Sequence, residues 1–201
     1  MAKQDAAKPE FWEKRFRDNF TPWDAGGIPP VLGQFLKTEP PGRRVLIPGC
    51  GSGYEVRAFA EAGHDVLAVD FAPAAVERAQ KILGTLSERV RLADFFESDF
   101  GAPYDLVYER AFLCSLPRPL RQRYVQRTLE LVPPQGRLAG FFFFEDGERG
   151  PPFGLKPGEL EALLAADFEQ TSDAAVHDSI PVFAGKERWQ IWKVRSTSRS
   201  A

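Results

Sequence analysis

A glycine-rich loop and a carboxylate about 20 residues after it are the residues best suited to bind a ligand. The loop, 49–53, has glycines at its first, third and fifth positions and follows the apolar segment 44–47. A second apolar segment, 66–69, ends at Asp70. In an open α/β sheet such glycines let a ligand approach the backbone, and the acid accepts hydrogen bonds from ribose hydroxyls. The pattern predicts a nucleoside site, although the glycines alone also suit a tight turn and Asp70 alone also suits a helix cap.

The spacing of the glycines separates two classes of nucleoside ligand. The chain has G-x-G-x-G, whereas the dinucleotide fingerprint is G-x-G-x-x-G, and its last glycine falls where this chain has Tyr54. That fingerprint holds a pyrophosphate on a helix N-terminus. S-adenosylmethionine has a ribose but no phosphate, so we predict it as the cofactor, with S-adenosylhomocysteine as its product. An NAD-dependent oxidoreductase is the alternative.

Two further segments are expected at the same edge of the sheet. Asp94 follows the third expected strand and could accept a hydrogen bond from an adenine amino group, while Phe95 or Phe96 stacks on the base. Arg110 follows the fourth expected strand and could hold a methionine carboxylate or contact the adenine. Asp94 could instead be a surface acid beside core aromatics. Arg110 could instead form a surface ion pair with Glu109.

Aromatic residues gather ahead of the first strand. Trp12, Phe16 and Trp23 lie within a short stretch that also contains Asp24. Large aromatic side chains are expected to cover an apolar surface. We therefore predict a lid that excludes water from the site, with a helix that only pads the sheet as the alternative.

The segments that must position these residues alternate between strands and helices. Strands are expected at 44–47, 65–69, 90–92, 104–108, 137–144, 168–176 and 188–194. Helices are expected at 9–19, 29–36, 54–62, 73–83, 119–131 and 156–166. The predicted fold is α/β and Rossmann-like, with a seven-stranded, mostly parallel sheet, an antiparallel last hairpin and an N-terminal helical lid.

This pattern divides the chain into four parts. We expect disordered tails at 1–8 and 196–201, a helical arm at 9–42 and a single cofactor-binding domain at 43–195. A chain of 201 residues is long enough for one such domain with a full core.

Composition narrows the possible partners. A net charge of −2 gives no broad basic surface, so nucleic acid is not expected. No signal-peptide pattern and no apolar run of about 20 residues is found, so we expect a cytoplasmic protein that does not enter a membrane.

The two cysteines, Cys50 and Cys114, suit neither a disulfide framework nor a metal site, and both are expected to be packing residues. His64 is expected to face solvent, and neither it nor His177 suits the role of a base.

The quoted residues resemble one known family. The most specific segments are Phe-Trp-Glu-Lys-Arg-Phe at 11–16, Thr-Pro-Trp-Asp-Ala-Gly at 21–26, the Pro-Gly-Cys-Gly loop at 48–51, and Glu-Arg-Ala-Phe-Leu-Cys-Ser-Leu-Pro at 109–117. Over about residues 11–195 the chain resembles the thiopurine S-methyltransferase family of class I S-adenosylmethionine-dependent methyltransferases. Within the family it is most similar to the thiol/halide type.

The resemblance implies roles for individual residues. Cofactor contacts are implied for Trp12, Trp23, Gly49, Cys50, Gly51, Asp70, Phe71, Asp94, Phe95 and Arg110. Arg110 and Phe112 would line the acceptor side, and no residue is assigned as a catalytic base. The resemblance also implies a small-molecule acceptor and a monomer.

Three positions depart from the pattern and leave the acceptor open. Phe16 stands where the family often has a second tryptophan, and Glu109 where it often has aspartate. Arg110 is typical of the thiopurine type, whereas halide-type members can have tyrosine there. Thiols, thiopurines, halides and related chalcogen compounds therefore all stay possible.

The expected reaction is an in-line displacement at the methyl carbon. Positioning and exclusion of water suffice for a soft nucleophile, because a thiol is already a few per cent ionised near neutral pH. Two further functions stay open at this point: a non-catalytic cofactor-binding protein, and a methyltransferase acting on a large substrate.

Overall fold

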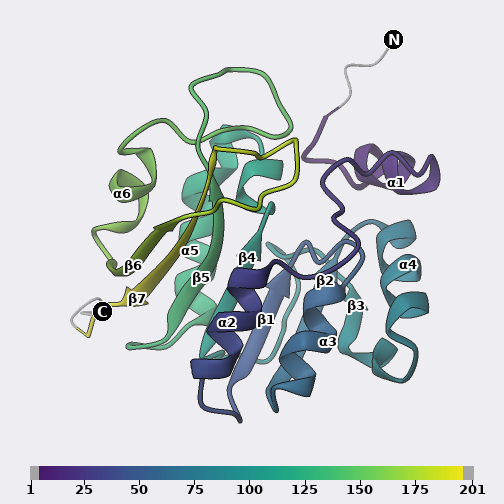
Figure 1. The fold of residues 1–201 in the computed structure, drawn as a ribbon, viewed down its shortest axis with the longest axis horizontal. Coiled ribbons are helices and arrows are strands. Elements are labelled where there is room, and N and C mark those ends of the chain that lie inside the picture. The colour runs from purple at the N-terminus through teal and green to yellow at the C-terminus, as the bar shows by residue number, and fades with distance from the viewer. Residues whose placement is uncertain (1–4, 197–201) are drawn as a thin grey trace.

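The computed structural model describes residues 5–196, which form a seven-stranded sheet. The strands are β1 (Arg44–Pro48), β2 (Asp65–Asp70), β3 (Val90–Leu92), β4 (Leu106–Arg110), β5 (Arg137–Phe143), β6 (Phe168–Ala175) and β7 (Glu187–Val194). Their order is β3-β2-β1-β4-β5-β7-β6 (Figure 1). All pairs are parallel except those of β7, which runs antiparallel to both β5 and β6. The predicted fold, with its antiparallel last hairpin, is confirmed.

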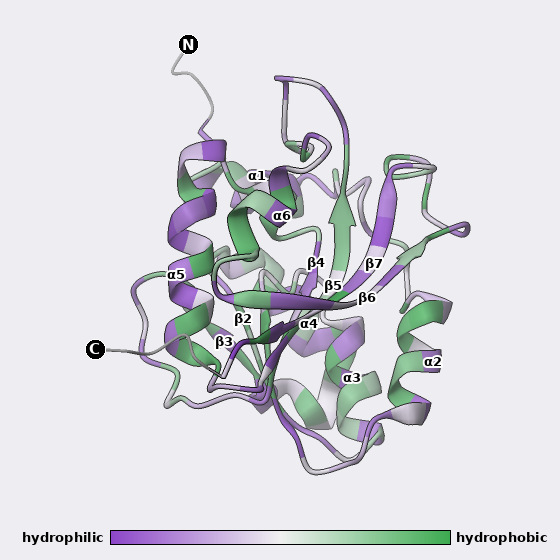
Figure 2. Cartoon of the chain, turned by 90° about the vertical axis from the view of Figure 1, so that its left-hand side faces the viewer, coloured by the Kyte–Doolittle hydropathy of each residue, from purple (hydrophilic) through white to green (hydrophobic). Residues whose placement is uncertain are grey.

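Helices cover both faces of the sheet. The helices α2 (Pro30–Thr38), α3 (Tyr54–Glu61) and α4 (Pro73–Leu83) pack on one face. The helices α5 (Arg121–Leu131) and α6 (Glu159–Leu164) pack on the other. Short 3₁₀ helices lie at η1 (Gly84–Arg89), η2 (Leu113–Ser115) and η3 (Arg118–Leu120). Figure 2 shows α5 and α6 on one side of the sheet and α2 and α3 on the other.

Alternating side chains of the central strands fill two separate cores. In β1, Leu46 packs toward α5 and α6, whereas its neighbours Val45 and Ile47 pack toward α2 to α4. In β4, Val107 packs toward α5 and α6, and Tyr108 packs toward α2 to α4. Since successive residues of a strand point to opposite faces, Glu109 faces α5 and Arg110 faces α3.

Strand β4 lies two residues later in the sequence than predicted. Its pairing with β1 begins at Leu106, opposite Val45. The preceding Asp105 bonds to Arg44 of β1 through its N–H and through its side chain, which accepts from the Arg44 N–H (2.8 Å), but it lies outside the strand. The predicted strand 104–108 was therefore wrong at both ends. The shift places Glu109 and Arg110 on the sheet rather than in the following loop.

The predicted N-terminal helix is present as α1 (Pro9–Arg17), which packs on α4 (Figure 1). A Glu13 carboxylate oxygen accepts a hydrogen bond from the Ala74 N–H (2.6 Å), in the first turn of α4. Arg78 of α4 donates to the Phe16 carbonyl (2.8 Å) and to the Asn19 side chain (2.7 Å). The middle and the C-terminal end of α1 are thus attached to one helix of the main domain.

The expected tails lie largely outside the described residues, which exclude 1–4 and 197–201. Residues 5–8, within the expected N-terminal tail, form a turn in which Ala6 is buried. The Ala6 carbonyl accepts a hydrogen bond from the Trp12 indole N–H (2.8 Å).

His64 is buried, so the prediction that it faces solvent was wrong. The imidazole packs edge to face against Phe59, with ring centroids 5.8 Å apart. Burial lowers the pKa of His64, which favours the neutral ring. Neither ring nitrogen has a hydrogen-bond partner among residues 5–196.

Within residues 5–196, none of the helices combines the length and apolar character that crossing a bilayer requires.

Gly140 of β5 offers a test of the packing between the two central strands. It pairs with Glu109, and a Cβ at position 140 would overlap the Glu109 carbonyl oxygen. We expect Gly140→Ala to lower the free energy of unfolding by about 1–3 kcal/mol, measured by urea denaturation. Gly33→Ala in α2 is the control, because its Cβ would meet open space. A helical alanine there should be neutral or stabilising. Equal effects of the two substitutions would contradict this account.

Candidate active site

A cavity of about 310 Å³ opens at the carboxyl ends of the central strands. It lies where the strand order reverses between β1 and β4, the place at which open α/β sheets bind their ligands. Its walls come from the glycine loop, the ends of β2 and β4, the N-terminal arm, and loops near residues 151 and 183. This volume falls at the lower end of the range for small-molecule sites.

The glycine loop brings bare backbone to the cavity. Gly49 has φ +60°, and a Cβ at this position would collide with the ring of Phe112. The loop is fixed to β2, because the Cys50 N–H donates to the Val69 carbonyl (3.0 Å). Glycine is therefore required at 49 both for its backbone angle and for the close approach of Phe112.

Asp70 joins the glycine loop to the start of α4. One carboxylate oxygen accepts from the Gly51 N–H (3.1 Å) and the other from the Ala72 N–H (3.0 Å). The helix-cap alternative was wrong, because the N-cap residue of α4 is Ala72, which makes no side-chain cap hydrogen bond. Asp70 instead closes the turn that leads into α4, and it lines the cavity wall. Burial raises the pKa of Asp70 to about 6, against the opposing effect of these N–H groups.

The aromatic wall follows β3. Asp94 accepts a hydrogen bond from the Phe96 N–H (2.7 Å), which orders the turn that carries Phe95. Phe95 is buried and meets Phe112 edge to face, with ring centroids 5.3 Å apart. Asp94, Phe95 and Phe96 all line the cavity, where the two rings meet edge to face at 5.4 Å and form an apolar surface with a carboxylate at its border.

Arg110 forms a buried ion pair with Glu55 of α3. Its Nη1 donates to a Glu55 carboxylate oxygen (2.9 Å) and to the Gly27 carbonyl (3.3 Å). Burial opposes the charge of Arg110, but Glu55, together with Tyr108 and Glu187, more than offsets this and raises the pKa of the guanidinium. The alternative of a surface pair with Glu109 was wrong, because Glu109 points to the opposite face of β4.

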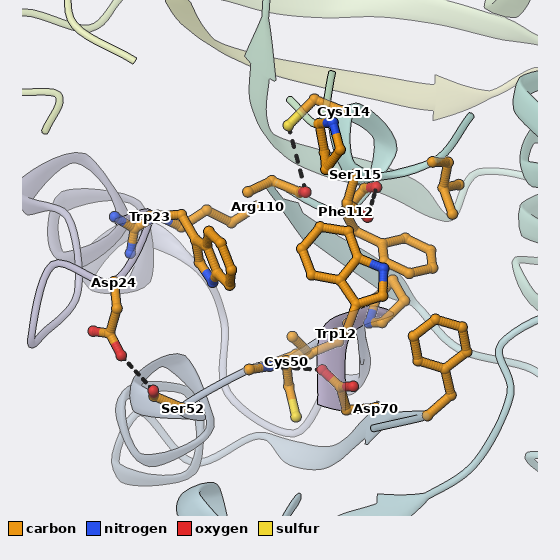
Figure 3. A pocket seen from close by; sticks show the side chains of 18 of the residues that line it. Trp12, Trp23, Asp24, Cys50, Ser52, Asp70, Arg110, Phe112, Cys114 and Ser115 are labelled. Atoms are coloured by element: carbon orange, nitrogen blue, oxygen red, sulfur yellow. Dashed lines mark hydrogen bonds between the residues drawn. The ribbon is translucent and has the colours of Figure 1, made fainter. Parts of the chain in front are cut away.

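The N-terminal arm lines the cavity with aromatic rings that pack edge to face. Trp23 meets Trp12 edge to face at 5.4 Å and Phe16 at 6.0 Å. The arm is tied to the glycine loop because the Ser52 hydroxyl donates to the Asp24 carboxylate. Figure 3 shows both indoles between Asp70 on one side and Cys114 on the other.

The structure brings all the predicted site residues to one cavity. Its lining includes Trp12, Trp23, Gly49, Cys50, Gly51, Asp70, Phe71, Asp94, Phe95, Arg110 and Phe112. Sequence reasoning missed Glu55 and the loop residues Pro151, Pro152, Val182 and Phe183. Glu55 lies four residues before the buried Phe59, and this helical spacing could have placed it on the inner face of α3. The two loops carry no comparable pattern.

The cavity lining suits a cationic nucleoside. It contains four carboxylates (Asp24, Glu55, Asp70 and Asp94) and two guanidinium groups (Arg15 and Arg110). An excess of carboxylates favours a ligand with an ammonium and a sulfonium over one with a pyrophosphate. The residues present therefore fit S-adenosylmethionine better than a dinucleotide.

Comparison with known proteins decides between these ligand classes. A model of the thiopurine S-methyltransferase family matches residues 7–196. This chain belongs to the thiopurine S-methyltransferase family. It is 32% identical to a probable thiol methyltransferase 2 of Arabidopsis thaliana, over 94% of this chain and 87% of that protein. It is 30% identical to a thiopurine S-methyltransferase of Aliivibrio salmonicida, over 93% of this chain and 99% of that protein.

A solved structure shares the fold of this thiopurine S-methyltransferase family member. The 1,6-didemethyltoxoflavin-N1-methyltransferase of Burkholderia thailandensis superposes with a TM-score of 0.76 and is 22% identical. The match covers 94% of this chain and 87% of that one. The predicted family and the predicted class of enzyme, an S-adenosylmethionine-dependent methyltransferase, are confirmed.

The buried carboxyl of Asp70 should give the methyltransferase a measurable pH dependence. With a pKa raised from 3.8 to about 6, the folded state holds more protons than the unfolded state between these two values. The wild type should therefore lose about 2–4 kcal/mol of stability relative to Asp70→Asn as the pH rises from about 4 to about 7. Denaturant titrations of both proteins across this range would measure the difference. A difference that stays constant with pH would contradict the assignment.

Proposed function

We propose that this enzyme transfers a methyl group from S-adenosylmethionine to a small, soft nucleophile: a thiol, a thiopurine, a halide or a related chalcogen compound. The observation that carries the proposal is the single cavity in which the glycine loop and Asp70 face an apolar wall. That wall includes Ala111, Phe112, Leu116 and Phe183. The names of the two relatives, one a thiol and one a thiopurine methyltransferase, support an acceptor that contains sulfur.

The cofactor would be held along the carboxyl ends of β1 to β4. We assign the ribose hydroxyls to Asp70, and the adenine to Asp94 with Phe95 and Phe71. The backbone of Gly49 to Gly51 would lie under the methionine part, with Arg110 near its carboxylate. Trp12 and Trp23 would cover the cofactor from the arm.

The surroundings of the acceptor favour charge neutralisation. S-adenosylmethionine, when bound, supplies a methyl group on a positively charged sulfur. The aromatic arm excludes water, which would otherwise stabilise the separated charges of the reactants. None of the described lining residues is a histidine. The site therefore suits a nucleophile that needs orientation rather than a base.

Arg110 is suited to orient an anionic group. Its side-chain hydrogen bonds within residues 5–196 all involve Nη1, which leaves the Nε and Nη2 donors for a ligand. Because Glu55 holds the guanidinium in place, little side-chain entropy is lost when a thiolate or carboxylate binds.

The cofactor assignment is tested by isothermal calorimetry with S-adenosylmethionine. Asp70→Ala should weaken binding at least about tenfold, because a hydrogen bond to a charged group contributes about 1.5–3 kcal/mol. Asp65→Ala is the matched control at the opposite end of β2. Its surface ion pairs with Arg44 and Arg89 contribute little, so affinity should stay unchanged. If the wild type binds the cofactor but methylates none of a panel of thiols, thiopurines, halides and thiocyanate, the enzymatic proposal fails.

Arg110 is tested by steady-state kinetics with the same panel. We expect Arg110→Lys to lower kcat/KM at least about tenfold, because lysine keeps the charge but loses the planar set of donors. Arg57→Lys on the exposed side of α3 should behave like the wild type. Wild-type kinetics for Arg110→Lys with every acceptor would contradict an orienting role.

A further inference from the structure

Glu109 is a buried carboxyl group that lies next to the cavity without lining it. The residue is only 1% exposed and faces α5. One carboxyl oxygen accepts a hydrogen bond from the Leu113 N–H (2.8 Å). The other oxygen is fully buried and has no hydrogen-bond partner among residues 5–196. Such a group is costly to bury, so its position calls for an explanation.

The hydrogen bond to Leu113 closes the turn that follows β4. The chain leaves the strand through Ala111, whose φ of +59° is unfavourable for a residue with a side chain. It then enters η2, where the Ser115 N–H donates to the Phe112 carbonyl (2.9 Å). A backbone in such a conformation persists only when surrounding contacts hold it, and Glu109 supplies one from inside the sheet.

This turn carries much of the acceptor wall. Phe112, Cys114 and Ser115 all line the cavity. The Phe112 ring occupies the space left by the missing side chain of Gly49 and also meets Tyr124 with ring centroids 6.1 Å apart. A small movement of the turn would therefore move the acceptor wall relative to the glycine loop.

We propose that Glu109 is a positioning residue for methyl transfer, which holds Phe112, Cys114 and Ser115 in place through its hydrogen bond to the Leu113 N–H. The proposal rests on the function proposed above for the same cavity. It explains why a carboxyl group is buried at a position where it cannot touch either ligand.

The protonation state of Glu109 gives this role a signature. Burial raises the pKa of Glu109 to about 8, against the opposing effect of the Leu113 and Phe112 N–H groups, and Glu187 of β7 adds to the rise. The other titratable groups that interact with it are Tyr108 of β4, Cys114 of η2 and Tyr124 of α5, and burial raises the pKa of each well above its usual value. The group is thus a neutral acid at pH 7. Above about pH 8 it becomes a buried charge that forms no ion pair among residues 5–196. The Leu113 N–H binds this charge more strongly than the neutral acid, but the cost of burial exceeds that gain, since the net pKa shift is upward, and it favours opening of the turn.

Two variants separate a positioning role from simple packing. Glu109→Gln keeps a neutral side chain of the same shape with an oxygen that can accept from the Leu113 N–H. Glu109→Leu fills the space but leaves that N–H buried and unpaired. We expect kcat/KM for the acceptor to fall at least about tenfold in Glu109→Leu, since an unpaired buried donor costs about 1–3 kcal/mol. In Glu109→Gln, kcat/KM should stay within about threefold of the wild type at pH 7. Glu161→Gln, at an exposed position of α6, is the control for the substitution itself.

The pH profile is the second readout. The ratio of Glu109→Gln to wild-type activity should rise between pH 7 and 9, because only the wild type ionises at this position. Taking the ratio at each pH cancels the ionisation of a thiol acceptor. A flat ratio, or a Glu109→Gln variant as impaired as Glu109→Leu, would overturn the proposal.

Hydrogen exchange tests the same hydrogen bond without turnover. The Leu113 amide should exchange faster in Glu109→Leu than in the wild type or in Glu109→Gln, with all three folded by circular dichroism. Unchanged protection in Glu109→Leu would overturn the positioning role even if the enzyme is active. If no acceptor reacts but the Leu113 amide responds as expected, the proposed function fails and the structural role of Glu109 stands.

Discussion

The attachment of the glycine loop to Asp70 is the contact on which the site depends. One carboxylate bonds to the backbone of the loop after β1 and to the turn that begins α4. These two segments follow the ends of the neighbouring parallel strands β1 and β2, so the contact fixes the distance between the segments. The N-terminal arm then uses both as supports, because Asp24 accepts from Ser52 of the loop and Glu13 accepts from the first turn of α4. The arm is thus held by the same elements that would hold the cofactor.

The alternation of side chains along β4 divides the chemistry between two faces. Arg110 points toward α3, where Glu55 neutralises part of its charge within a site that is open to ligand. Glu109 points toward α5, where burial among aromatic rings keeps it protonated. Glu109 and Arg110 are adjacent in the sequence and usually carry opposite charges, but they do not form an ion pair with each other. One contributes its charge to the cavity, and the other contributes a hydrogen bond to the turn that shapes the cavity.

Much of the fold could be predicted because its pattern is local. Apolar runs of strand length alternate with helical periodicity, and proline at the first turns of α1, α2 and α4 marks where helices begin. Most of the site could be predicted for a related reason. Residues that follow parallel strands must meet at one edge of the sheet, so Asp70, Asp94 and Arg110 were placed together without knowledge of their contacts.

The sequence by itself determined the class of fold, the glycine loop and the family of enzyme, since these depend on residue types at fixed spacings. Only the tertiary structure decided the partners of the charged groups. The pairing of Arg110 with Glu55 joins residues 55 positions apart that the sheet brings together, whereas the burial of His64 and the bond from Leu113 to Glu109 depend on how short turns fold against the sheet. Strand geometry sends Glu109 and Arg110 to opposite faces, because β4 extends through residue 110 and pairs there with β5.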